Sequence, residues 1–242
     1  GFGGARGSGR GRTLSGRPTV QHCSDLLCVW AYAAGIRLER LVERYRDRVG
    51  FETHVCSVFP DTAGKIEAAW GARGGAAAYG AHVQEIAARF DHIRVHADVW
   101  TRVRPASSTA PHLFLKAARL AEEAADGPRP PWQARHHRLA TALRRAFFEE
   151  ARDIATWEVQ ADCAADLGLD PAAVEARLRS GEAAGALDRD LKLGQTLKVS
   201  GSPTFVMNEG RQVLYGNVGF HLLEANVEEL LRSPGPGEAS WC

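Results

Sequence analysis

VQHCSDLLCVWAYAAG, residues 20–35, carries one thiol at the end of a strand-like run and a second thiol where a helix should begin. These are Cys23 and Cys28, and their C-x4-C spacing matches neither the C-x-x-C of a dithiol redox helix nor a standard zinc knuckle. After Cys28, apolar side chains recur near helical spacing up to Val42. The stretch therefore predicts a strand over residues 18–24, a turn, and a helix that starts at a cysteine.

The residues that follow extend this unit. Gly50 gives a helix-ending signal, and residues 51–59, FETHVCSVF, alternate enough to form a second strand with Cys56 inside it. Residues 61–197 are rich in Ala and Arg, with helical patterns that break at Gly- and Pro-rich points. A β-α-β unit followed by a large helical block is therefore expected.

A hairpin is expected after the helical block. The stretch GSPTFVMNEGRQVLYG, residues 201–216, has apolar runs at 204–207 and 212–215 around a turn, and a final helix pattern follows at 221–232. The predicted class is α/β, with a fold interrupted by a helical insertion. The predicted boundaries are 18–60 for the first β-α-β part, 61–190 for the insertion and 191–232 for the β-β-α part.

The two ends of the chain differ from this pattern. Residues 1–17 are rich in Gly, Arg and Ser and predict a disordered tail, while residues 233–242, SPGPGEASWC, predict a flexible arm that ends in Cys242. The arm places a thiol on a tether that can search nearby space. Cys242 is therefore one candidate for a second functional thiol, in the same subunit or across a homodimer, beside the alternative of an incidental tail cysteine.

Composition limits the function classes. The 242 residues are 45% hydrophobic with a formal net charge of +1, so the overall charge gives no reason to expect nucleic-acid or membrane binding. Five cysteines are too few for a secreted disulfide scaffold, and no apolar signal core is seen. We therefore expect a cytoplasmic globular protein whose thiols have separate roles.

Two motifs carry a resemblance to a known family. SDLLCVWAY, residues 24–32, resembles the S-D-x-x-C-P-W-C-Y active site of the FrnE-like branch of the DsbA family. VSGSPTFV, residues 199–206, resembles that family's G-V-P-T-F-V segment, in which the proline is cis and faces the active-site thiol. A weaker match, PASSTAPHLFLKAA at residues 105–118, resembles its P-N-S/T-x-x-A-H-x-L stretch. The resemblance implies a thioredoxin-like fold of the DsbA type and a thiol-disulfide oxidoreductase.

The resemblance also implies roles for individual residues. Cys28 stands at the nucleophilic position and Trp30 at the family's tryptophan, while Ser202 and Pro203 would shape the substrate groove. A thiol in the first turn of a helix faces free backbone N–H groups, which predicts a lowered pKa for Cys28. Asp25 is expected to cap this helix and hold it in place.

Departures from the family pattern leave the function open. Ala31 stands where the family has its second cysteine, so a C-x-x-C disulfide cannot form. The related kappa-class glutathione transferases and hydroxychromene-carboxylate isomerases carry a serine at the nucleophilic position. The first hypothesis is a single-cysteine thiol-disulfide oxidoreductase acting on disulfides. The alternative is an isomerase or transferase that uses a low-molecular-weight thiol as cofactor and acts on a small molecule.

Cys23 has three interpretations. It is a buried small hydrophobe, or it resolves a mixed disulfide at Cys28, or it joins His22 and Cys28 in a soft-metal site for copper or zinc. Cys56 and Cys163 are expected to be core residues without a role. The resolving thiol is thus predicted to be Cys23, Cys242 or an external thiol.

Overall fold

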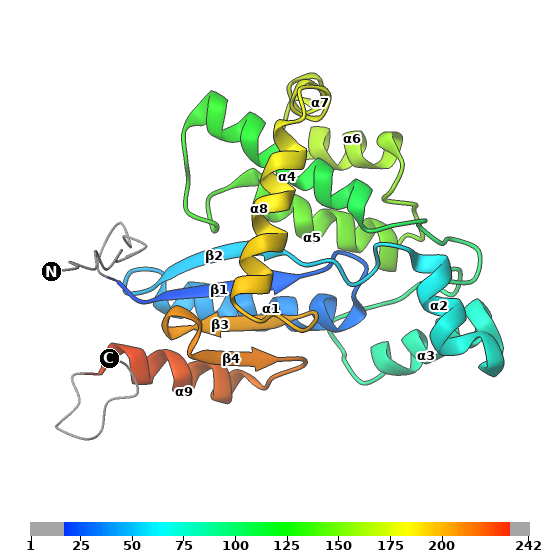
Figure 1. The fold of residues 1–242 in the computed structure, drawn as a ribbon, viewed down its shortest axis with the longest axis horizontal. Helices are drawn as coiled ribbons and strands as arrows, with labels where there is room; N and C mark the ends of the chain where they lie inside the picture. Colours follow the sequence, from blue (N-terminus) through cyan, green and yellow to red (C-terminus); the bar gives the residue numbers. More distant parts are fainter. Residues whose placement is uncertain (1–16, 233–242) are drawn as a thin grey trace, which may run out of the picture.

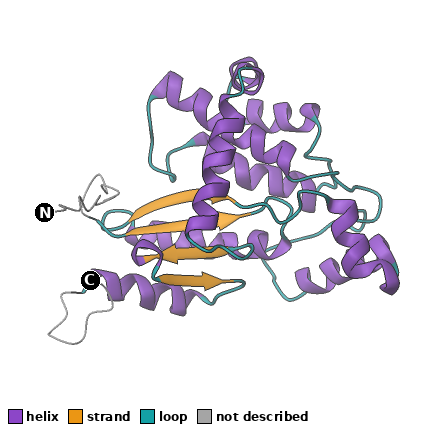
Figure 2. Cartoon of the chain, in the orientation of Figure 1, coloured by secondary structure: helices purple, strands orange, loops and turns teal. Residues whose placement is uncertain are grey.

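The computed structural model describes residues 17–232 and contains a four-stranded sheet in the order β2-β1-β3-β4. β1 pairs in parallel with β2 and antiparallel with β3, and β3 pairs antiparallel with β4. The strands are β1 (Thr19–Ser24), β2 (Gly50–Val55), β3 (Thr204–Met207) and β4 (Gln212–Tyr215). Figure 2 shows the sheet against the helices that surround it. The central pair β1 and β3 therefore comes from opposite ends of the sequence.

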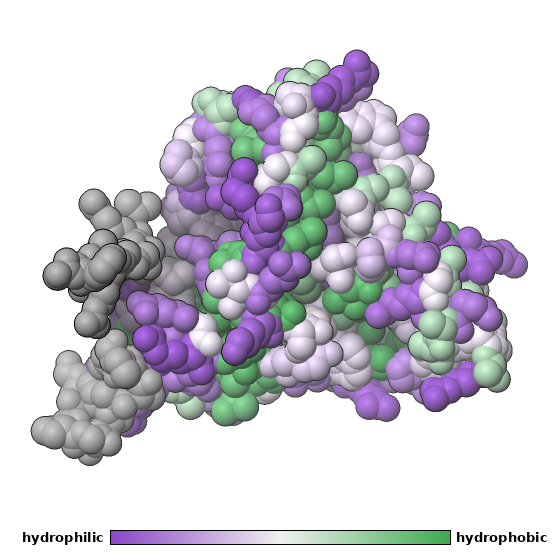
Figure 3. All heavy atoms as spheres, viewed as in Figure 1, coloured by the Kyte–Doolittle hydropathy of each residue, from purple (hydrophilic) through white to green (hydrophobic). Residues whose placement is uncertain are grey.

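Helices cover both faces of the sheet. α1 (Val29–Tyr45) and α9 (Phe220–Leu231) pack on one face, where a buried cluster includes Val20, Leu41, Phe205 and Leu223. α8 (Glu182–Thr196) lies across the other face (Figure 1). The outer side of α8 forms a column of hydrophilic residues in Figure 3, which agrees with the exposure of Asp188, Arg189, Lys192 and Gln195.

The remaining helices form the insertion between β2 and β3. They are α2 (Thr62–Trp70), α3 (Gly75–Ala87), α4 (Thr109–Asp126), α5 (Arg135–Phe148), α6 (Trp157–Asp166) and α7 (Pro171–Arg179). A short 3-10 helix, η1 (Gly71–Arg73), lies between α2 and α3, and a second one, η2 (Asn208–Gly210), lies between β3 and β4. A second buried cluster joins this insertion to the first turn of α1 and includes Leu27, Ala31, Trp100, Phe114 and Phe147. The insertion thus forms a wall behind the start of α1. No described helix is long and apolar enough to span a lipid bilayer.

Most predicted elements are present, with shifted limits. The hairpin strands occupy 204–207 and 212–215, as expected. α1 ends at Tyr45 and Gly50 begins β2, so the prediction that Gly50 closes the helix was wrong. α8 runs through residue 190, where the sequence suggested the insertion would end. The predicted disordered tail, apart from residue 17, and the C-terminal arm lie outside the described residues.

Candidate active site

The two motifs singled out in the sequence meet at the start of α1. Cys28 is the N-cap residue of this helix, and its Sγ lies 3.3 Å from the backbone oxygen of Ser202, although 174 residues separate the two. The Ser202–Pro203 peptide bond is cis. Cys28 is 6% exposed and Ser202 is 7% exposed. The thiol is therefore held against the backbone of the segment that precedes β3.

Burial controls the acidity of this thiol. It raises the pKa of Cys28 above the ordinary cysteine value, and hydrogen bonds from Ser202 and from the N–H groups of Ala31 and Trp30 offset that rise only in part. The lowered pKa expected from the helix N-terminus was wrong. The helix N–H groups do act in the predicted direction, but loss of solvent around the sulfur outweighs them.

Asp25 holds the loops around Cys28 together. Its side chain is fully buried, and its Oδ1 accepts from the N–H of Leu27 at 2.9 Å. Its Oδ2 accepts from the N–H of Val58 at 2.8 Å, the N–H of Phe59 at 3.1 Å and the hydroxyl of Ser108 at 2.7 Å. One carboxylate thus joins the start of α1, the segment after β2 and the start of α4. The prediction that Asp25 caps α1 was wrong, because Cys28 is the N-cap residue and no side chain caps this helix. Asp25 instead supports the surrounding loops from a position that a substrate cannot reach.

α4 supplies a second brace that the sequence analysis did not identify. His112 Nε2 accepts from the N–H of Leu26 at 3.1 Å, and the Asp25 backbone N–H donates to Ser202 Oγ at 2.9 Å. Burial lowers the pKa of His112 to about 4, in keeping with an unprotonated Nε2. Ser108 and His112 lie in the stretch 105–118 that weakly matched the family pattern, which was the available signal.

A cleft of about 630 Å³ opens beside Cys28. Its lining includes Trp30, Tyr79, Cys56 and Tyr215, and among the described thiols only Cys28 and Cys56 line it. Cys56 is partly buried just beyond the end of β2, and its Sγ lies 3.7 Å from the backbone oxygen of Gly201. The expectation that Cys56 is a strand residue in the core was therefore wrong. Both sulfurs contact carbonyl oxygens of adjacent residues.

A thiol at a helix start, beside a cis-proline segment and next to a helical insertion, calls for comparison with known families. The sequence matches the DSBA-like thioredoxin domain over residues 19–228. The chain belongs to the DSBA-like thioredoxin domain family. This membership confirms the predicted family and the thioredoxin-like fold.

Solved structures show the same fold. A probable DsbA oxidoreductase from Streptomyces coelicolor has a TM-score of 0.69 at 21% identity, covering 91% of this chain and 92% of its own. Cytosolic disulfide reductase DsbM from Pseudomonas aeruginosa with GSH has a TM-score of 0.60 at 22% identity, covering 87% and 99%. A 2-hydroxychromene-2-carboxylate isomerase has a TM-score of 0.59 at 19% identity, covering 88% and 96%. A search of the curated proteins gave no match.

The other predicted site residues of this DSBA-like protein are dispersed. Cys23 is 1% exposed, lies outside the cleft lining, and has a pKa raised to about 12, chiefly by burial. His22 alternates with Cys23 along β1 and lines a different cavity from Cys28. Among residues 17–232 no three His, Cys, Asp or Glu side chains are placed to hold a metal ion. The copper or zinc site predicted on His22, Cys23 and Cys28 is therefore not formed.

Of the two remaining cysteines only Cys163 is among the described residues, and it does not line the cleft. Cys163 is 6% exposed in α6 and belongs to the buried cluster of the helical insertion, as predicted. Cys242 lies outside the described residues, so its predicted role stays a prediction.

Trp30 does line the cleft beside Cys28, and its ring packs edge-on against Phe90 with centroids 6.2 Å apart.

Proposed function

We propose that this DSBA-like protein is a thiol-disulfide oxidoreductase in which Cys28 attacks the substrate and Cys56 resolves the mixed disulfide. The observation that carries the proposal is the pairing of these thiols in one cleft, where they contact the carbonyl oxygens of Ser202 and Gly201. Ala31 removes the usual resolving position in the helix, and Cys56 offers a thiol from the neighbouring loop. Cys23 is buried outside this cleft and is not proposed as the partner.

The reaction proceeds by two exchanges. Cys28 loses its proton to solvent and attacks a substrate disulfide R–S–S–R′, which forms a Cys28–S–S–R bond and releases R′S⁻. Cys56, after losing its own proton, attacks the Cys28 sulfur, which forms a Cys28–Cys56 disulfide and releases RS⁻. The substrate gains two electrons and the protein loses two. A low-molecular-weight thiol then reduces the protein disulfide, and two of these thiols leave as one oxidised disulfide.

Burial controls the protonation state of both cleft thiols. The pKa values of Cys28 and Cys56 are both raised by burial, so each thiol is mostly protonated at neutral pH. Each thiol must therefore lose its proton before it attacks, and only the small thiolate fraction reacts at neutral pH.

Variants of the full chain test the proposal. With a small alkyl disulfide as substrate and glutathione as reductant, Cys28→Ser should abolish turnover, because the proposal assigns the first attack to Cys28 and leaves Cys56 the second step only. Without glutathione, Cys56→Ser should stop after the first exchange as a mixed disulfide at Cys28, which is visible as a mass increase. Cys163→Ser is the matched control, since that thiol is equally buried but lies in α6. Full activity of Cys28→Ser would refute the proposal.

A second candidate function rests on the size of the cleft. Its volume of about 630 Å³ lies within the ~300–1,000 Å³ of small-molecule sites, so a thiol cofactor and a small electrophile are an alternative occupant. An isomerase or transferase would not need Cys56. If Cys56→Ser kept full turnover of a small electrophile with glutathione, while disulfide reduction was absent in the unchanged protein, this alternative would replace the first.

Location and assembly rest on the sequence alone. A cytoplasmic setting, with its pool of low-molecular-weight thiols, suits the proposed reduction of the Cys28–Cys56 disulfide. A homodimer remains the predicted route by which Cys242 of one subunit would approach the cleft of another. Size-exclusion chromatography with light scattering tests the homodimer directly.

A further inference from the structure

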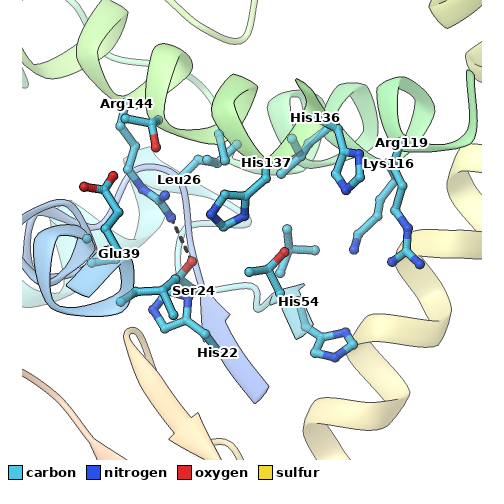
Figure 4. Close-up of a pocket in the computed structure, with 18 residues that line it drawn as sticks. His22, Ser24, Leu26, Glu39, His54, Lys116, Arg119, His136, His137 and Arg144 are labelled. Atoms are coloured by element: carbon cyan, nitrogen blue, oxygen red, sulfur yellow. Dashed lines mark hydrogen bonds between the residues drawn. The ribbon is translucent and has the colours of Figure 1, made fainter. Parts of the chain in front are cut away.

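A second cavity lies across the first turn of α1 from the thiol cleft. Trp30 lines the cleft, whereas Ala31 lines this cavity, which is enclosed by side chains from β1, β2, α1, α4 and α5 (Figure 4). Its volume is about 60 Å³. At roughly 15 Å³ for each water position, this is room for about four waters or for an ion of a few heavy atoms.

Most basic groups of the cavity already have acidic partners. The pairs are Lys116 with Asp190, Arg119 Nε with Glu123 Oε1 at 2.7 Å, His136 Nδ1 with Glu122 Oε2 at 2.7 Å, and His54 Nδ1 with Asp190 Oδ1 at 3.1 Å. These contacts hold α4, α5, β2 and α8 together. They account for the charges around the cavity without any ligand.

Arg144 is the exception. Its Nη2 donates to Ser24 Oγ at 2.7 Å, but its buried Nε has no hydrogen-bond partner. Within residues 17–232 Arg144 is in no ion pair, and Glu39, the acidic residue of the lining, is exposed. Arg144 is partly buried, and the buried carboxylate of Asp25 attracts its charge without forming a contact with it. A guanidinium is always charged, and a buried N–H that has no acceptor is costly. The described protein thus leaves the Nε–H of Arg144 without an acceptor.

Two imidazoles beside Arg144 also lack partners. His22 is 4% exposed and its Nε2 has no hydrogen-bond partner, and His137 makes no hydrogen bond among the described residues. Figure 4 shows Arg144, His137 and His22 around one space. Burial, followed by the charge of Arg144, lowers the pKa of His22 to about 3. Burial and the nearby charges of His136 and Arg144 lower the pKa of His137 to about 4.

These groups define the chemistry of a ligand. At neutral pH the cavity presents one fixed positive charge and two neutral imidazoles, each of which can offer one N–H. A cation would be repelled, and an apolar group would leave the polar atoms unpaired. An oxygen-rich anion satisfies the guanidinium by paired charge-assisted hydrogen bonds and has further oxygens for the imidazoles.

We infer that this cavity binds a small oxyanion, a carboxylate or a phosphate-type group, through Arg144 with His22 and His137. The site is separate from the thiol cleft and does not depend on the proposed disulfide exchange. Its size excludes a nucleotide, so the bound group is a free ion or a small acid.

Calorimetric titration of the full chain with acetate and with inorganic phosphate, at constant ionic strength in chloride, tests the inference. Saturable binding should weaken at least 10-fold in Arg144→Gln and less than 2-fold in Arg145→Gln. Arg145 is the matched control because it is the next residue of α5, is exposed, and pairs with Glu149. The ion that binds more tightly identifies the group as carboxylate or phosphate.

A second variant guards against misfolding. His137→Leu keeps the Arg144 charge and should weaken binding of the same ion by about 10- to 150-fold, the loss expected for one hydrogen bond to a charged group. Absence of saturable binding for both ions would overturn the inference. Binding that Arg144→Gln and His137→Leu leave unchanged would overturn it as well.

Discussion

Replacing Asp25 by Ala should greatly lower the free energy of unfolding of the protein. The change removes the acceptor of the buried N–H groups of Leu27 and Phe59, of the partly buried N–H of Val58, and of the Ser108 hydroxyl. The hydroxyl can rotate toward another acceptor, but the three N–H groups cannot. At ~1–3 kcal/mol for each buried unsatisfied group, the sum is roughly 3–9 kcal/mol, and water entering the space brings it to about 3–5 kcal/mol.

Asp25→Asn gives a graded comparison. An amide oxygen in the place of Oδ2 still accepts from Val58 and Phe59, while the NH₂ group faces the Leu27 N–H and leaves that donor unsatisfied. The expected cost is about 1–3 kcal/mol. Asp61→Ala is the control, because exposed Asp61 caps α2 through one hydrogen bond to the Gly64 N–H at 3.0 Å and should cost about 1 kcal/mol.

Urea unfolding followed by circular dichroism measures all three variants, with equal m-values required for the comparison. The order expected is Asp25→Ala, then Asp25→Asn, then Asp61→Ala. If Asp25→Ala fell within 1 kcal/mol of Asp61→Ala, the three N–H groups would have other acceptors. The claim that one carboxylate holds the active-site loops would then be wrong.

Two further predictions follow from the titrating groups. Burial raises the pKa of Asp190, but hydrogen bonds from His54, Lys116 and the Val55 N–H and the Lys116 charge lower it to about 2. Because the pKa of Asp190 in the unfolded chain is near 4, its contribution to stability is complete above that pH and is lost as the pH falls toward 2. Asp190→Asn should therefore flatten the pH dependence of urea unfolding in that range. Equal slopes for variant and parent would contradict this. Because burial raises the pKa of Cys28, its alkylation by iodoacetamide at pH 7 should be slower than that of a free cysteine peptide. Peptide mass spectrometry should show that the rate rises through alkaline pH. Rapid labelling at pH 6 would show instead that the helix N–H groups outweigh burial in setting this pKa.

Local patterns predicted the framework well. The hairpin at 204–207 and 212–215 was predictable because two short apolar runs around an Asn-Glu-Gly turn specify it within a few residues. The start of α1 at Cys28 was predictable because apolar residues recur at helical spacing after it. The position of Cys56 beyond the end of β2 was not, because the segment that follows this strand is held by Asp25, a residue 33 positions away from Val58.

Quantities that depend on three-dimensional burial could not be predicted from the sequence. The helix N-terminus gave the correct sign for one contribution to the acidity of Cys28, yet its 6% exposure decides the balance. The isolation of Arg144 likewise appears only after every neighbouring carboxylate is assigned to another partner. In the sequence Arg144 is one of 30 Lys and Arg residues opposed by 29 acidic ones.

The 174-residue separation between Cys28 and Ser202 has a consequence for biosynthesis. A ribosome that adds ~5–20 residues per second needs roughly 9–35 s to progress from one to the other. During that interval the nascent chain has no β3 to complete the centre of the sheet and no backbone oxygen opposite the thiol. Cys28 then lacks the backbone contact that it has in the complete fold. Any adduct that it acquires must be removed before the hairpin can dock, so completion of the fold selects chains whose thiol is still free.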